Sequence, residues 1–217
     1  MTTTTLSRTH VSTGCLAEYD AFATLIEGLS ETDWNAATRC VGWLARDTAG
    51  HVIGLAEDTA AGVPGSRNSE EEAASVRHES PSGAAARLRT ATATLRTLLD
   101  AIDDDVWNGP SGLPDLTLGE GVLTLWYDTY VHADDIRAAA GRTSARGDGL
   151  DATIAYLARQ LTAKGWGPAT LALDEVGRHD VGGGGPEISG DALQFALVAT
   201  GRADPATVGL DPDVNIY

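Results

Sequence analysis

Two histidines of the sequence stand inside apolar stretches, with acidic residues at helical spacing beside them. His51 lies in GWLARDTAGHVIGLAED, four residues after Asp47, and His132 lies in LWYDTYVHADDIRAA, four residues after Asp128 and three before Asp135. Residues four apart share one face of a helix, so Asp128 and His132 can point at one spot. If the two helices pack side by side, His51 completes a set of two imidazoles and one carboxylate.

Such a set, with a fourth position open, is typical of a catalytic divalent metal. Zinc is the first candidate, because structural zinc is normally closed by four protein ligands that usually include thiolate. Asp135 or Asp47 could accept the second N–H of a ligating imidazole and fix its tautomer. The alternative is that each histidine is a hydrogen-bonded residue of an apolar core. Spacing alone leaves both interpretations open.

The helices that position these residues are predicted from the periodic spacing of apolar residues. Five helices are predicted, over about residues 11–29, 43–61, 81–102, 117–141 and 151–164. Thr117 and Glu120 form a T-x-x-E capping box at the start of the fourth helix. The polar string SEEEAAS at 69–75 is expected to be a solvated loop.

The helical spacing of apolar residues gives way to strand-like alternation near Gly165. Alternating residues predict a strand in WGPATLALDEVG and a second short strand in HDVGGGGPEI, where His179 and Asp180 are expected to be an exposed turn pair. Ser189 is expected to cap a last helix. We therefore predict two domains, a helical bundle over residues 1–164 and a small α+β domain over residues 165–217.

Three blocks of the sequence resemble the mycothiol-dependent maleylpyruvate isomerase family of the DinB-like superfamily. They are TDWNAATRCVGWLARDTAGHVIG, LWYDTYVHADDIRAAAGR and ISGDALQFALVATGR. The resemblance implies a mainly α fold, a DinB-like four-helix bundle followed by a small α+β C-terminal domain. It also implies mycothiol as a thiol cosubstrate and a divalent metal, usually zinc, held by His51, the acid at position 128 and His132.

The chain departs from the family pattern in two places. The family ligand is typically Glu where this chain has Asp128, whose stem is one methylene shorter, so direct coordination and contact through water both stay open. The C-terminal part is also compact, and Arg202 in its TGR element is the basic residue that could contact an anion there. The alternative is that Arg202 caps the C-terminus of a helix. Asp135 is predicted to orient the site or relay a proton.

These features predict a metal-dependent, thiol-using transferase or isomerase that acts on a small electrophilic metabolite. A metal would lower the pKa of the thiol and supply thiolate at neutral pH. Neither Cys15 nor Cys40 is needed as nucleophile, and Cys40 is expected to be a small buried residue. Two alternatives remain: a metal-free binding or regulatory protein on the same bundle, and a biosynthetic enzyme that uses the cleft for acid–base catalysis.

The net charge of the chain argues against some classes of binding partner. Its 15 basic and 31 acidic residues give a net charge of −16, which disfavours binding to nucleic acid or to an anionic membrane. No apolar run approaches the roughly 18 residues of a membrane helix, and the N-terminus lacks the layout of a signal peptide. We expect a cytoplasmic protein, monomeric or homodimeric, with a small-molecule substrate. The preference for Arg over Lys suggests a GC-rich, actinobacterial genome.

Overall fold

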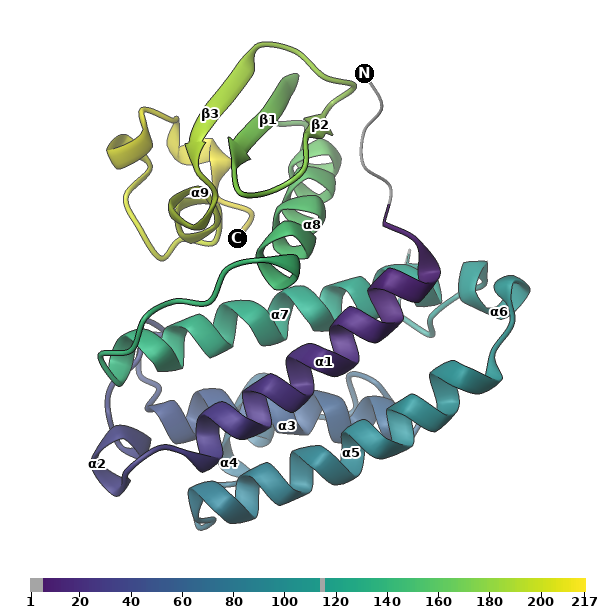
Figure 1. The fold of residues 1–217 in the computed structure, drawn as a ribbon, viewed down its shortest axis with the longest axis vertical. Coiled ribbons are helices and arrows are strands. Elements are labelled where there is room, and N and C mark those ends of the chain that lie inside the picture. The colour runs from purple at the N-terminus through teal and green to yellow at the C-terminus, as the bar shows by residue number, and fades with distance from the viewer. Residues whose placement is uncertain (1–5, 114–115) are drawn as a thin grey trace. The chain divides into compact units, whose positions relative to one another are not determined.

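Four long helices build the first of two units in the computed structural model, which describes residues 6–113 and 116–217 (Figure 1). α1 and α3 each pack against both α5 and α7, so the four helices enclose one core in the unit of residues 8–144. The four helices are α1 (Arg8–Glu27), α3 (Ala45–Ala60), α5 (Pro81–Ala101) and α7 (Leu118–Ala139). Three short helices lie in the connections: α2 (Glu31–Trp34), α4 (Ser69–Ala74) and α6 (Asp104–Asn108).

Large side chains fill the core of this bundle. Trp126, Tyr19, Tyr130 and Phe22 are among the largest fully buried side chains. Each buried side chain of this size stabilises the fold by about 1.5–3 kcal/mol relative to an exposed one. The apolar periodicity that predicts the helices is therefore also what holds them together.

Local capping sets where two of the helices begin. The hydroxyl of Thr117 accepts a hydrogen bond from the Glu120 amide, and the Glu120 carboxylate accepts one from the Thr117 amide, as the capping box predicts. Asn68 and Glu71 form a second box, which starts α4. The expectation of a solvated loop at 69–75 is therefore wrong. Its polar residues support a short helix that packs on α3 and buries Glu72.

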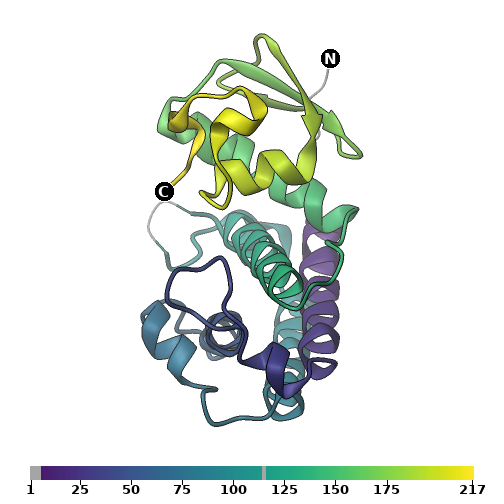
Figure 2. The same cartoon turned by 90° about the vertical axis from the view of Figure 1, so that its left-hand side faces the viewer.

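The second unit, which spans residues 145–217, is a small α+β structure (Figure 2). Its strands have the order β2–β1–β3, with β2 antiparallel and β3 parallel to β1. α8 packs against β2 and α9, so this helix, which the sequence pattern placed with the bundle, has its contacts in the C-terminal unit. The elements are α8 (Asp148–Lys164), β1 (Ala169–Asp174), β2 (His179–Val181), β3 (Glu187–Asp191) and α9 (Ala192–Ala199), followed by 3-10 helices η1 (Pro205–Val208) and η2 (Pro212–Val214).

Two local expectations in this unit are wrong. Ser189 lies within β3, and Asp191 caps α9 by accepting a hydrogen bond from the Gln194 amide at 2.8 Å. His179 is buried in β2, with Nε2 3.0 Å from Oδ1 of Asp151 on α8. The partner of His179 thus comes from another element, and adjacency to Asp180 in the sequence gave no sign of it.

No helix among the described residues is long and apolar enough to cross a membrane.

Candidate metal centre

The packing of α3 against α7 brings together the three residues that spacing and resemblance single out. Nε2 of His51 lies 3.5 Å from Oδ2 of Asp128, and Nε2 of His132 lies 3.5 Å from Oδ1 of the same carboxylate. The two imidazole rings meet edge to face, with centroids 5.1 Å apart. One carboxylate and two ring nitrogens therefore converge inside the bundle.

Each of the two imidazoles also has a second carboxylate close to its Nδ1 atom. Nδ1 of His51 lies 2.7 Å from Oε2 of Glu72, and Nδ1 of His132 lies 3.2 Å from Oδ2 of Asp135. Glu72 and Asp135 are both buried. An ionised carboxylate only accepts hydrogen bonds, so each Nδ1 donates and each Nε2 is directed at Asp128.

The sequence pattern identified one of these two outer carboxylates. Asp135 lies where the i, i+3 spacing predicts. Asp47, the other candidate, is instead the acceptor for the Leu44 amide at the start of α3 and for Nε of Arg77. Glu72 was not predicted: the Asn68–Glu71 capping pattern could have revealed the helix α4, but not which of its residues are buried.

The charges of the cluster stabilise one another. Burial alone would lower the pKa of His51, but the nearby Asp128 carboxylate and the hydrogen bond to Glu72 outweigh burial and raise that pKa to about 9. Burial also opposes the charged form of His132, yet the Asp128 carboxylate raises the pKa of His132 well above its usual value. Burial would raise the pKa of Asp128, and the imidazoles of His132 and His51 instead hold it below the usual range.

The donor set and its spacing fit a divalent metal. Two ligand atoms, each about 2.1 Å from a tetrahedral zinc ion, lie roughly 3.4 Å apart. The two nitrogen–oxygen separations of 3.5 Å, one to each oxygen of Asp128, are close to this value and are long for a direct hydrogen bond. The three donor atoms lie within 4.8 Å of one another. Two imidazoles and one carboxylate are also ligands that zinc accepts in catalytic sites.

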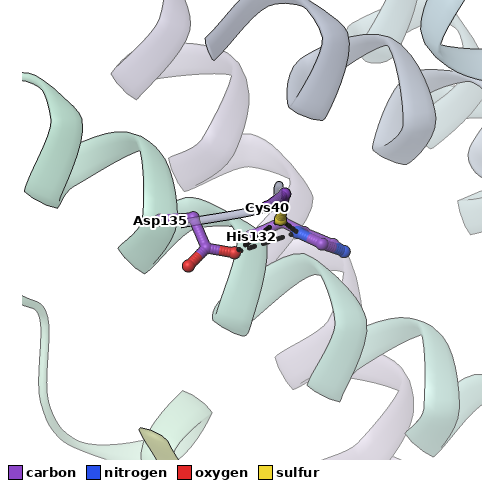
Figure 3. Close-up of side chains that lie close together, drawn as sticks. All are labelled: Cys40, His132 and Asp135. Carbon is purple, nitrogen blue, oxygen red and sulfur yellow. Dashed lines mark hydrogen bonds and ion pairs between the residues drawn. The ribbon is translucent and has the colours of Figure 1, made fainter. Parts of the chain in front are cut away.

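Cys40, His132 and Asp135 form a second group of possible ligands (Figure 3). Sγ of Cys40 lies 3.6 Å from Nδ1 of His132 and donates to Oδ2 of Asp135 at 3.3 Å. Nε of Arg39 lies 3.5 Å from the other oxygen of Asp135. The Asp135 carboxylate thus already faces a thiol, an imidazole and a guanidinium, an arrangement that holds the His132 ring in place. Cys40 is half-buried, whereas the sequence predicts a small buried residue.

A cavity opens beside the His51–Asp128–His132 group. It has a volume of about 220 Å³, and His51 and Asp128 contribute to its wall, whereas Cys40 and Asp135 do not. The indole of Trp43 packs near both imidazoles, with centroids 5.4 Å from His51 and 6.5 Å from His132. The first group therefore has what a catalytic metal needs, space for a substrate next to the ligands.

Arg202 lies in the C-terminal unit, just after α9. Its Nη1 donates to the carbonyl oxygen of Thr200 at 3.2 Å, a contact typical of a basic residue at a helix C-terminus. The role of Arg202 toward an anion stays a prediction.

Comparisons with known proteins agree with this architecture. The family model of the mycothiol maleylpyruvate isomerase N-terminal domain matches residues 15–137, a range that contains all three candidate ligands. A crystal structure of the mycothiol-dependent maleylpyruvate isomerase has 19% identity and a TM-score of 0.64. A histidine-to-alanine mutant of that enzyme has 18% identity and a TM-score of 0.63. Each match covers 98% of both chains, which confirms the predicted fold class. A search of curated protein sequences finds no match.

Proposed function

The chain belongs to the mycothiol maleylpyruvate isomerase family, and from this premise we propose that it is a metal-dependent enzyme that uses mycothiol to transform a small electrophile. One observation carries the metal dependence: two imidazoles and a carboxylate converge beside a cavity, and a buried carboxylate stands behind each imidazole. A hydrogen-bonded core histidine needs one partner, not this paired arrangement.

Each residue of the group has a distinct role in the proposal. His51, Asp128 and His132 hold the metal, and Glu72 and Asp135 keep the two imidazoles oriented through Nδ1. The metal, when bound, lowers the pKa of the mycothiol thiol so that thiolate forms at neutral pH. In this proposal Asp135, whose Oδ2 lies 3.2 Å from Nδ1 of His132, also exchanges a proton with that imidazole. Arg202 is retained as the proposed anion contact of the C-terminal unit.

The reaction begins with addition of the thiolate sulfur to an electrophilic carbon. In a transferase the new S–C bond remains, and the displaced electron pair takes up a proton. In an isomerase the added sulfur turns a conjugated C=C bond into a single bond, the substrate rotates about it, and the same sulfur leaves as the double bond forms again. Both outcomes need the same site, so the substrate decides between them.

Metal content and thiol consumption test the proposal together. Protein purified without a histidine tag should carry about one zinc ion per chain, and His51→Ala and His132→Ala should each lose it. The wild type should also consume mycothiol in the presence of at least one maleyl-type or epoxide electrophile. Equal and negligible zinc in all three proteins would overturn the metal claim. Turnover that survives complete chelation would favour acid–base catalysis, and zinc without any turnover would favour a binding protein.

A further inference from the structure

The wall of the cavity beside His51 and Asp128 is almost wholly apolar. Most of its residues come from α3, from α7 and from the loops before α4 and α7. Among them are Leu55, Leu113, Val122 and Leu125. Apart from His51 and Asp128 at one end, no described residue of the wall bears a charge, and none is Arg or Lys.

Each of the three hydroxyl groups among the described residues of the wall donates its proton to a nearby backbone carbonyl, and for Ser111 this is the carbonyl of Leu113 at 3.4 Å. Thr59 donates to the carbonyl of Leu55 at 2.7 Å, and Thr124 donates to the carbonyl of Glu120 at 2.9 Å. A serine or threonine hydroxyl has one proton to donate. A carboxylate placed in this cavity away from its His51–Asp128 end would therefore meet no cation and no free side-chain hydroxyl donor from either threonine.

We infer that this cavity binds an uncharged, apolar part of the electrophile, an aryl or alkyl group, with the reactive carbon at the His51–Asp128 end. The inference rests on the proposed function and names its substrate class. A carboxylate would lose its hydration there without compensation, whereas an apolar group gains by leaving water. This cavity thus favours a substrate that presents an uncharged group to it over a dicarboxylate with a charged group at that position, because the charge would need a partner there.

The volume limits the size of the group. A cavity of about 150 Å³ lined by apolar side chains holds benzene, so the 220 Å³ here suits a group of roughly eight to ten non-hydrogen atoms. A second apolar cavity of about 190 Å³ shares four wall residues with the first, Thr59, Leu118, Val122 and Leu125, and extends toward α1 and α5.

Binding of two unreactive probes of equal size tests the cavity without any thiol chemistry. Fluorine NMR of the full-length protein should show 4-fluoroacetophenone bound at least about tenfold more tightly than 4-fluorobenzoate, which replaces its methyl group by a charged oxygen. Gly121 lines the cavity, and a Cβ there meets only Ser111, at the ordinary distance of 3.5 Å. Gly121→Leu should therefore weaken ketone binding about tenfold by occupying the space, and Gly121→Ala should do so less.

Ala86→Leu, on the exposed side of α5, adds bulk away from the cavity and should leave the affinity unchanged. Thermal unfolding of each variant shows whether it is folded. Equal or tighter binding of the carboxylate, or ketone binding that Gly121→Leu leaves unchanged in a folded protein, would overturn the inference.

Turnover separates this inference from the proposed function. With metal and mycothiol, the epoxides from 1,2-epoxybutane to 1,2-epoxyoctane should give β-hydroxy thioethers: an S–C bond forms, a ring C–O bond breaks and the oxygen takes up a proton. The ratio kcat/KM should rise with chain length, up to about fourfold per methylene. Turnover that prefers charged epoxysuccinate would contradict the inference and leave the proposed function intact. Selective ketone binding without turnover of any electrophile would support the inference and contradict the proposed function.

Discussion

Oε2 of Glu72 lies 2.7 Å from Nδ1 of His51, and the carboxylate is 2% exposed. The contact joins the short helix α4 to α3 and directs Nε2 of His51 toward Asp128. Partners of this kind fix a ligand's tautomer and raise its basicity. We predict that Glu72→Ala lowers zinc affinity by about 10-fold to 100-fold and that Glu72→Gln, which keeps an acceptor without the charge, lowers it less. Competition with a coloured chelator measures both values.

Glu71→Gln is the matched control for this prediction. Glu71 is the exposed neighbour on the same helix, and glutamine also completes a capping box. Its zinc affinity should equal that of the wild type. If Glu72→Ala binds zinc as tightly as the wild type while α4 remains folded, Glu72 has no role in metal binding.

Cobalt substitution distinguishes the two groups that share His132. If His51, Asp128 and His132 bind the metal, the cobalt protein shows no intense sulfur-to-metal band in the near ultraviolet, and Cys40→Ser binds cobalt like the wild type. His51→Ala and Asp128→Asn should lose binding. A strong sulfur band that disappears in Cys40→Ser would assign the metal to Cys40, His132 and Asp135 instead.

Part of this centre was predictable because it depends on local geometry. The i, i+4 spacing of Asp128 and His132 fixes their common face once α7 forms, and Asp135 follows at i+3. The pairing with His51 needs only that α3 lies beside α7, which the family resemblance implies. The bundle itself follows from apolar periodicity over long helices, where that signal is strongest.

Glu72 and the cavity could not be predicted in the same way. Glu72 lies in a six-residue helix, too short to show periodicity, and its burial depends on contact with α3. His179 is similar, because its partner Asp151 lies on another element. The shape of the cavity depends on the loops that precede α4 and α7. Contacts of this kind arise only from tertiary packing, for which sequence spacing holds no signal.

Asp58 links the end of α3 to the loop that leads into α4. Its carboxylate accepts hydrogen bonds from Nε and Nη2 of Arg67 and from the hydroxyl of Ser66, and Arg67 holds the pKa of Asp58 below its ordinary value. A lowered pKa means that the ionised carboxyl stabilises the fold at neutral pH. That stabilisation falls as the pH drops below about 4, the unfolded-state value, and is lost once the pH passes through the lower folded-state pKa.

We therefore predict that Asp58→Asn lowers the free energy of unfolding by about 2 kcal/mol at neutral pH. The difference from the wild type should shrink in urea titrations at progressively lower pH. Asp100→Asn, at an exposed position of α5, should show no such difference at any pH. If the difference in the free energy of unfolding between Asp58→Asn and the wild type stays constant as the pH falls, the charge of Asp58 does not contribute to stability.

Gly14 on α1 lies directly against the indole of Trp126 on α7. A Cβ at position 14 would overlap the six-membered ring of Trp126, a side chain that is 1% exposed. In an unconstrained helix, Gly→Ala stabilises by up to about 1 kcal/mol. Here overpacking should reverse the sign, so that Gly14→Ala destabilises by about 1–3 kcal/mol and lowers Tm by several degrees. Gly121→Ala, where the added methyl meets no such obstacle, should keep or raise Tm. If Gly14→Ala raised Tm as well, helix propensity would outweigh the packing of α1 against α7 at this point.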